Sequence, residues 1–159
     1  MGSLVGSRVE RKEDKRFLTG KGRYTADINI INQTYAVFVR SPHARAKIKK
    51  VNFSKASKAP GVVSVLTGAD IVKDKIGGLI AGWKIVSEDG TDMKVPAHPP
   101  LASDAVNYVG DHVAVVIAES VDEAKAAANS VEVDYKVLQA VTSTADAMKS
   151  EKIYSDIDK

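Results

Sequence analysis

Three histidines are the first candidates for chemistry in this sequence, because a neutral imidazole can bind a metal or transfer a proton near pH 7. They are His43, His98 and His112. No two of them have the spacing of a metal-ligand pair, and no carboxylate joins them in a facial-triad pattern. The sequence has no cysteine, which excludes thiolate ligation of zinc or of an iron–sulfur cluster by this chain. Structural or surface roles are therefore favoured for all three histidines.

A glycine pair and a group of polar residues suggest two further kinds of site. Gly20-Lys21-Gly22 is a bare Gly-x-Gly, whereas a phosphate-binding loop needs a preceding strand, a third glycine and a following helix. The flanking residues predict neither element, so a tight turn is favoured. Ser103-Asp104 and Asp111-His112 lie in one neighbourhood, but no Gly-x-Ser-x-Gly elbow accompanies them, so a hydrolase triad has little support.

Positive charge is concentrated in the first part of the chain. Residues 1–58 hold fourteen Lys/Arg and four Asp/Glu, a net charge of +10, and residues 59–159 hold nine and sixteen, a net charge of −7. Residues 40–58 contain seven basic residues and no acidic one. This basic strip could contact phosphates, but only Phe53 offers a ring for base stacking, and the acidic second part would repel nucleic acid. A solvent-facing or subunit-facing strip is favoured.

Strands and helices must position these residues. The strands are predicted first, from segments rich in the β-branched and aromatic residues that favour them. His112 to Ala118 is apolar almost throughout, as expected where both faces of a strand are covered. Residues 46–53 alternate with an imperfect phase, which indicates a half-exposed strand. The predicted strands are residues 26–31, 35–40, 46–53, 62–66, 112–118 and 131–137.

Capping residues place short helices between these strands. Ser120 and Glu123 form a capping box before an alanine-rich stretch, whose small side chains can pack flat on a sheet. A shorter helix begins after Ser54 and ends at Pro60-Gly61, because proline cannot extend it and glycine can adopt the left-handed cap. The predicted helices cover residues 55–59, 121 to about 129 and 144 to about 148, with a turn or single helical turn at 68–71.

Strand–helix–strand thus occurs twice, at residues 46–66 and 112–137. This predicts an α/β or α+β fold, with two such units on a mixed sheet and right-handed crossovers. The length of 159 residues corresponds to one domain, and the hydrophobic fraction of 44% is ordinary for a globular protein. No apolar run reaches the roughly 18 residues of a membrane helix, and no targeting segment is expected.

Residues 73–100 are rich in glycine and proline and show no clear period. A loop of more than about 15 residues without structure of its own is usually functional or disordered. Trp83, the only tryptophan, lies inside this loop. It could fill a hydrophobic gap or line a pocket, and core packing is the favoured interpretation.

Five segments, in order along nearly the whole chain, resemble the large subunits of molybdenum hydroxylases of the xanthine dehydrogenase / aldehyde oxidase family. The similar segments are Arg8–Ile28 with its Gly-x-Gly-x-aromatic-x-x-Asp turn, Val39–Ile48 with Arg-Ser-Pro-His-Ala, Ala59–Asp70 with Pro-Gly-Val, Tyr108–Glu119 and Val131–Leu138. Within the family, Gly82-Trp83-Lys84, Ser87–Gly90 and Pro99–Ala102 look most similar to the carbon monoxide dehydrogenase branch. The substrate is not inferred from that branch.

The resemblance implies an α/β hammerhead domain that precedes the domains binding a molybdopterin dinucleotide. The family's pterin-binding loops, its active-site loop and its late Gly-x-Gly-Glu have no counterpart here, so the chain alone is expected to be inactive and to hold no cofactor or metal. Molybdopterin cytosine dinucleotide with molybdenum, FAD and [2Fe-2S] clusters are implied in partner regions. The implied partners are the molybdopterin-binding domain or chain and the FAD and iron–sulfur subunits, in a cytoplasmic dimer of heterotrimers.

The resemblance also assigns expected roles to parts of the chain. Residues 1–33 are a basic arm with a first strand, 34–149 the hammerhead domain, and 150–159 a polar tail. The loop at 77–100 is expected to approach the substrate funnel, and the arm and the basic strip are expected to dock partners. A stand-alone binding module of hammerhead fold without redox activity is the alternative. The funnel candidates are Leu79, Ile80, Gly82 and Trp83, and the structural motif residues are Gly20, Gly22, Asp27, Pro42, His43 and Gly110.

Overall fold

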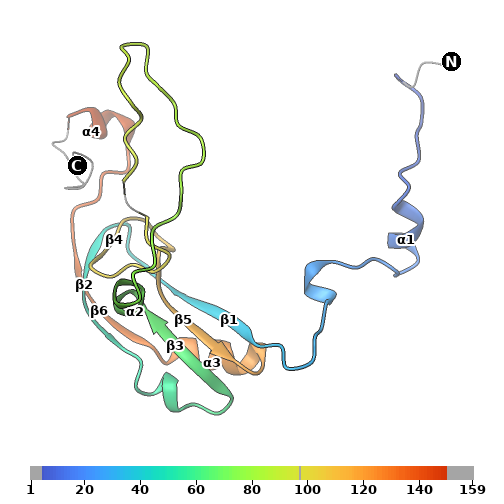
Figure 1. Cartoon of the computed structure of the whole chain (residues 1–159), viewed down its shortest axis with the longest axis horizontal. Coiled ribbons are helices and arrows are strands. Elements are labelled where there is room, and N and C mark those ends of the chain that lie inside the picture. Colours follow the sequence, from blue (N-terminus) through green and yellow to red (C-terminus); the bar gives the residue numbers. More distant parts are fainter. Residues whose placement is uncertain (1–4, 97, 150–159) are drawn as a thin grey trace. The chain divides into compact units, whose positions relative to one another are not determined.

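The computed structural model describes residues 5–96 and 98–149 (Figure 1). The chain divides into two compact units, Met1–Gln33 and the remainder from Thr34 on. Each unit is described by itself below. The predicted polar tail at 150–159 lies outside the described residues.

The first unit contains two short helical segments, α1 (Asp14–Leu18) and the 3₁₀ turn η1 (Thr25–Asp27). The strand predicted at residues 26–31 is therefore wrong. The Asp27 carboxylate accepts a hydrogen bond from the Tyr24 backbone N–H at 2.9 Å, and the Asp27 N–H donates to the Tyr24 carbonyl at 3.0 Å. These local bonds satisfy the backbone within the turn and compete with strand formation.

Six strands of the second unit form two three-stranded sheets, and every pairing is antiparallel. The first sheet has the order β1-β5-β3, and the second has the order β4-β2-β6. The strands are β1 (Tyr35–Arg40), β2 (Ala46–Asn52), β3 (Val62–Thr67), β4 (Ala105–Val106), β5 (His112–Ala118) and β6 (Glu132–Val137).

This topology confirms a mixed α/β fold but corrects the predicted single mixed sheet. Both strand–helix–strand units exist, yet each crosses from one sheet to the other: β2 and β3 lie in different sheets, and so do β5 and β6. The connection between β2 and β3 spans only residues 53–61. Parallel neighbours in one sheet need a crossover of about a dozen residues, so this connection is too short to make β2 and β3 parallel neighbours in one mixed sheet.

The first sheet is covered on one face by α3 (Val121–Asn129). The alanine-rich face predicted for this helix is confirmed, because Ala124, Ala127 and Ala128 are buried. Val116, in the central strand β5, is fully buried in the same cluster. The opposite face of the sheet carries Val115, which packs with Leu101 and with Ile71 of α2 (Gly68–Lys73). Both faces of β5 are therefore covered, as its apolar sequence predicts.

A β-bulge explains the imperfect alternation of the second sheet's central strand. Ile48 pairs with Tyr135 and Val51 pairs with Val133, but the register shifts between Ile48 and Lys50, which leaves Lys49 as the extra residue. The bulge lets Ile48 and Val51, three positions apart, face one apolar cluster.

The N-cap predicted at Ser120, at the beginning of α3, is confirmed in the structure. The Ser120 Oγ accepts a hydrogen bond from the Glu123 backbone N–H at 3.2 Å and donates to the Glu123 carboxylate at 2.7 Å. We expect Ser120→Ala to lower the free energy of unfolding by about 1 kcal/mol, because one helix N–H loses its acceptor. Urea unfolding measures the change, with Ser57→Ala as the matched control at an exposed hydroxyl. Equal effects of the two substitutions would contradict the assignment.

A capping box begins α2, and it makes stability depend on pH. The pKa of Asp70 lies below its ordinary value of 3.8 because the Thr67 backbone N–H and hydroxyl both donate to its carboxylate. A carboxylate whose pKa falls on folding stabilises the protein above its unfolded pKa, and this stabilisation is lost as the pH falls through the folded pKa. We expect Asp70→Asn to destabilise the protein near pH 7 and the difference from wild type to shrink below about pH 4. Urea titrations across this range test it; a pH-independent difference would exclude the mechanism.

The last helix, α4 (Thr144–Lys149), also begins as predicted, since the Ser143 Oγ accepts from the Asp146 N–H at 3.1 Å. Across residues 5–96 and 98–149, no helix is both long and apolar enough to cross a bilayer.

Candidate functional site

The long loop between α2 and β4 is irregular along most of its described residues, and hydrogen bonds join its two legs. Its two legs meet at the base, where the Leu79 N–H donates to the His98 carbonyl at 2.8 Å. Toward the tip, Val86 and Asp92 form an antiparallel bridge, and the Met93 N–H donates to the Ile85 carbonyl at 2.9 Å. Figure 1 shows this irregular hairpin, in yellow-green, extending away from the two sheets.

A cleft of ≈ 600 Å³ lies at the base of this hairpin. One side is formed by apolar residues from the two legs, and the other by the chain that leads from the loop through β4 to β5. The cleft is lined by Leu79, Ile80, Ala81, Val95, Pro96, His98, Pro99, Ala102, Ala105, Asn107, Tyr108 and Asp111. A volume of this size accommodates a small organic molecule, and its largely apolar lining with a few polar groups is typical of ligand sites.

The polar groups of the cleft come from His98 and from the turn before β5. The Tyr108 hydroxyl lies 3.4 Å from the His98 Nε2, and the two rings meet edge to face with centroids 6.1 Å apart. Asp111 is only 7% exposed, and its carboxylate accepts a hydrogen bond from the Asn107 backbone N–H at 3.0 Å. The pKa of Tyr108 is raised by partial burial and by the neighbouring Asp111 carboxylate. Tyr108 therefore remains a neutral phenol, able to donate a hydrogen bond, at physiological pH.

A second turn, at residues 41–43, is hydrogen-bonded to the turn before β5, and the two turns together contain three of the predicted structural residues. The Gly110 N–H donates to the Ser41 carbonyl, and the Ser41 N–H donates to the Asp111 carbonyl, each at 2.8 Å. The buried Ser41 Oγ accepts from the His43 N–H at 3.0 Å, around the bend that contains Pro42. The His43 ring packs edge-on against Tyr135 of β6. The backbone groups of Ser41, Gly110 and Asp111 therefore join the two turns.

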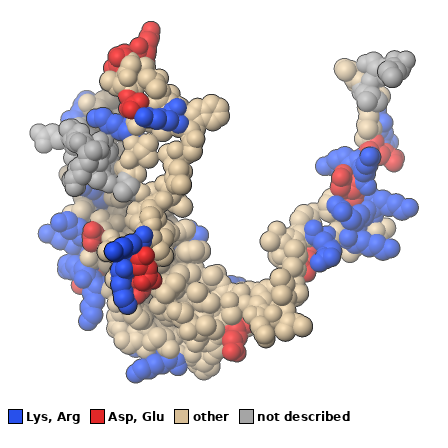
Figure 2. All heavy atoms as spheres, in the orientation of Figure 1, with Lys and Arg blue, Asp and Glu red and all other residues tan. Residues whose placement is uncertain are grey.

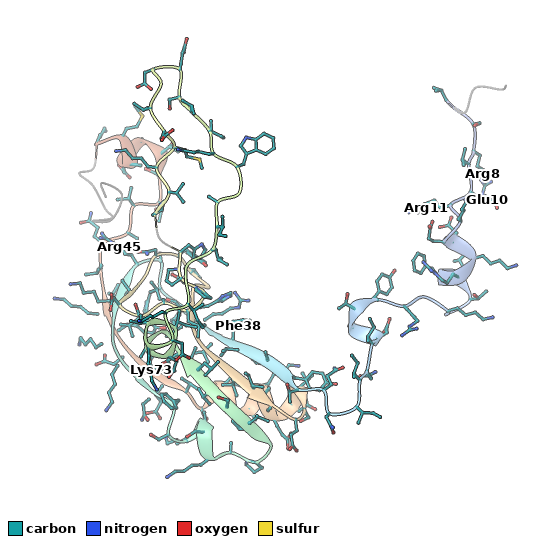
Figure 3. The ribbon with its side chains drawn as sticks, viewed as in Figure 1. Arg8, Glu10, Arg11, Phe38, Arg45 and Lys73 are labelled. Carbon is teal, nitrogen blue, oxygen red and sulfur yellow. The ribbon has the colours of Figure 1, made fainter. Side chains whose placement is uncertain are left out.

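The other three predicted structural residues lie in the first unit. Gly20 has a φ of 68°, which fits the predicted tight turn. Gly22 allows close packing, because a Cβ there would lie 2.7 Å from the Phe17 ring, which itself stacks on Tyr24. Asp27 closes the η1 turn. Arg8, Glu10 and Arg11, near the beginning of this unit, are labelled in Figure 3.

The predicted funnel residues divide into two groups. Leu79 and Ile80 line the cleft, whereas Gly82 and Trp83 lie farther along the loop and are not among the lining residues. Core packing of Trp83 was the favoured interpretation, and it is wrong for this chain, because the side chain is 81% exposed. Side chains of the hairpin project outward from its ribbon (Figure 3).

Three of the seven basic residues of the strip lie on β2, and β6 supplies two of its counter-charges. Lys55 pairs with Glu132 at 2.7 Å, and Lys49 lies 3.8 Å from Asp134. These pairs are exposed, so they contribute little to stability. Figure 2 shows Lys and Arg side chains gathered on the side of the second unit where β2 and β6 lie, and Arg45 is labelled there in Figure 3. The strip therefore remains predominantly basic.

The candidate polar residues were only partly predictable. The sequence favours a structural or surface role for His98, and Tyr108 stands out only as part of the segment 108–119 that resembles the family. The Tyr-x-Gly-Asp spacing before an apolar strand is a turn signal, because glycine with a φ of 94° at Gly110 lets the chain reverse. That signal does not show that His98, ten residues earlier in the sequence, lies beside Tyr108 in the folded domain.

Among residues 5–96 and 98–149, no three His, Asp or Glu side chains are grouped to hold a metal ion. The polar set is also unlike a hydrolase triad, since His112 stacks on Phe38 at 4.3 Å instead of joining a serine.

Comparison with known proteins gives a consistent result. The sequence model of the aldehyde oxidase and xanthine dehydrogenase a/b hammerhead domain matches residues 19–139. The chain is 41% identical over 139 residues to the nicotine 6-hydroxylase large subunit of Paenarthrobacter nicotinovorans, covering 87% of this chain and 16% of that protein. It is 35% identical over 147 residues to the carbon monoxide dehydrogenase large chain of Afipia carboxidovorans, covering 91% and 17%.

A solved structure extends the likeness to three dimensions. Quinoline 2-oxidoreductase from Pseudomonas putida 86 superposes with a TM-score of 0.81 at 35% identity, over 92% of this chain and 18% of that one. The chain thus spans about one sixth of the length of these relatives. From its sequence, its two-sheet fold and these matches, the chain belongs to the a/b hammerhead domain family of aldehyde oxidases and xanthine dehydrogenases.

Proposed function

We propose that this chain acts as the hammerhead domain of a molybdenum hydroxylase large subunit, and that it docks through its long loop onto the cofactor-binding region of that subunit. The single observation that carries the proposal is the exposure of apolar side chains on this loop: Leu79 is 62% exposed, Trp83 81% and Ile80 92%. Soluble proteins rarely leave such a group of apolar side chains in water unless it forms a contact. The relatives, about six times longer, contain ample chain to cover them.

The cofactors of the proposed enzyme would lie outside this chain. One relative with a solved structure is described as a Cu,Mo-CO dehydrogenase. We propose molybdopterin cytosine dinucleotide in the remaining part of the large subunit, with FAD and [2Fe-2S] groups in partner subunits of a cytoplasmic dimer of heterotrimers. Bound molybdenum would supply the hydroxylation chemistry. The residues of this chain would shape the approach to it, exclude water with Leu79 and Ile80, and orient a polar substrate atom with Tyr108.

The arm at 1–33 and the basic strip at 40–58 are proposed as additional docking surfaces. Their excess of Lys and Arg would attract acidic surfaces of the partner subunits, and the attraction would weaken at high salt. Gly82 would give the loop room to bend beside Trp83. The residues from 34 to 149 form the body of the proposed domain.

Binding between this chain and a separately produced cofactor-binding region tests the docking. We expect Trp83→Ser to weaken the association by at least about tenfold, because buried aromatic anchors contribute about 2 kcal/mol or more at interfaces. Val63→Ser is the matched control, since Val63 is also well exposed but lies on the β3 bulge. Calorimetry measures both affinities. Absence of binding by the wild-type chain, or equal affinities of the two variants, would refute docking through the loop.

A further inference from the structure

Strand β1 lies at an edge of the first sheet, where an extended polypeptide segment can pair with it. Among residues 5–96 and 98–149 only β5 pairs with β1, and Tyr35 to Val39 do so in unbroken register (Figure 1). Every second residue of an edge strand turns its N–H and C=O groups away from the neighbouring strand. The other edge strand of this sheet, β3, is less regular, because its register shifts between Val62 and Ser64.

The sequence of β1 lacks the features that usually prevent an edge strand from pairing. Such strands are commonly protected by lysine, proline or other charged side chains. At an edge of the second sheet, β6 follows this rule, since Glu132, Asp134 and Lys136 alternate along it. The sequence of β1 is Tyr-Ala-Val-Phe-Val-Arg, and its single charge is on its last residue, Arg40. Its β-branched and aromatic residues favour strand pairing.

A groove of ≈ 420 Å³ lies between β1 and α3. It is lined by Val37, Phe38, Val39, Arg40, Lys125, Ala128 and Asn129. Val37 and Val39 belong to the apolar cluster that α3 covers. Phe38, labelled in Figure 3, comes between them in the strand and therefore points to the opposite face. Because residues of both faces line the groove, it lies along the outer edge of β1.

The charged side chains of this groove are all cationic. Arg40 and Lys125 line it, and its other lining residues are uncharged. The Arg40 guanidinium lies 5.9 Å from the Phe38 ring centroid, and its Nη1 donates to the Gly110 carbonyl at 3.1 Å. Lys125 is exposed on α3. A segment that complements this groove therefore carries carboxylates together with apolar side chains.

We propose that the outer edge of β1 binds an extended, acidic segment of a partner polypeptide, which joins the first sheet as an added strand. Its backbone would pair with β1, its apolar side chains would pack on Phe38 and Val39, and its carboxylates would approach Arg40 and Lys125. In this mode of binding, main-chain hydrogen bonds provide affinity and alternate side chains provide specificity. The proposal concerns residues outside the long loop and does not rest on the proposed function.

Three short peptides separate backbone pairing from charge. Acetyl-Glu-Val-Thr-Glu-Val-Thr-amide turns one glutamate toward each face of a sheet, because its glutamates are three positions apart. A second peptide has lysine in place of both glutamates, and a third keeps the glutamates but has methylated backbone nitrogens, which cannot donate to a strand.

We expect the full wild-type chain to bind the acidic peptide about tenfold more tightly than the lysine peptide, because two partly exposed ion pairs replace two repulsions. The methylated peptide should show no saturable binding. Titrations followed by ¹H–¹⁵N NMR measure the dissociation constants and show whether amides of β1 and α3 shift. Nuclear Overhauser effects between the acidic peptide and β1 identify the paired strand.

A charge reversal on α3 tests the role of Lys125. Lys125→Glu should reduce the preference for the acidic peptide to near unity. Lys58→Glu is the matched control, because Lys58 is also exposed, lies outside the groove lining and gives the same change in net charge. It should keep the preference, and dispersed NMR spectra identify folded variants.

Equal binding of the acidic and lysine peptides, or an unchanged preference in Lys125→Glu, would overturn the acidic character of the occupant. Saturable binding of the methylated peptide, or shifts confined to other strands, would overturn strand addition at β1. Concentration-dependent shifts of β1 amides without peptide would show that a second copy of the chain occupies this edge, and would also overturn the proposal. Failure of the chain to bind the cofactor-binding region refutes the proposed docking and leaves these peptide results unaffected.

Discussion

Replacing Gly68 by alanine is expected to destabilise the protein by about 2–3 kcal/mol, although alanine is the better helix former. Gly68 is the first residue of α2 and is buried. A Cβ at this position would lie 2.6 Å from the Cα of Ser103 and closer still to the Ala102 carbonyl group. These are backbone atoms, so neither can move aside by changing a rotamer.

The Gly68→Ala substitution would disturb the cleft as well as α2. Ala102 lines the cleft, and its N–H donates to the His112 carbonyl at 2.7 Å, which fastens the chain after the loop to β5. Pushing residues 102 and 103 outward would strain this bond. Gly77→Ala is the matched control, because nothing lies within 4 Å of its added Cβ and its φ is not in the left-handed region. Thermal and urea unfolding should show a change within about 0.5 kcal/mol for the control. Comparable losses in both variants would contradict the packing argument.

Replacing Gly61 by alanine is the second large expected effect, at about 2 kcal/mol. Gly61 has a φ of 70°, a conformation that costs an alanine about 1–2 kcal/mol. A Cβ there would also collide with the Glu123 carboxyl group, which accepts a hydrogen bond from the Ser120 hydroxyl at the N-cap of α3. The substitution therefore strains the turn before β3 and disturbs the beginning of α3 together.

Gly90→Ala separates these two contributions. Gly90 has a φ of 82°, but nothing lies within 4 Å of an added Cβ, so only the backbone cost applies. Urea unfolding should show a larger loss for Gly61→Ala than for Gly90→Ala. Removing the carboxyl group with Glu123→Ala should make the Gly61 substitution less harmful, as a double-mutant cycle measures. If the two substitutions change the free energy of unfolding additively, there is no steric clash between the added Cβ at position 61 and the Glu123 carboxyl group.

The positions of most helices and strands of this domain can be predicted from local signals in the sequence. The pairing of the strands into two sheets cannot. The caps at Ser120 and Ser143 depend on contacts three residues apart, so they can be read directly from the sequence. The division into two sheets depends on which distant strands pair, and single-sequence periodicity does not contain that information. Strand β4 has two residues, too few to show an alternating pattern.

The residues of the candidate site can also be predicted only in part from the sequence, because their contacts depend on the tertiary arrangement. Leu79 and Ile80 were inferred from a family resemblance, and both line the cleft. The polar partners were missed, because Tyr108 and His98 come together only when the hairpin legs pair at Leu79. Trp83 was expected in a core because large aromatic residues are usually covered. In this chain it is exposed on a loop, which is the observation from which docking is proposed.

Molybdenum content and hydroxylase turnover, measured for this chain alone and after assembly with the cofactor-binding region and partner subunits, test the central claim most directly. The claim is that this chain shapes and docks while chemistry occurs elsewhere. It predicts no bound molybdenum and no turnover for the chain alone, and stoichiometric molybdenum with turnover for the assembly. Stoichiometric molybdenum and turnover in the isolated chain, or undiminished turnover in an assembly that lacks it, would contradict the claim.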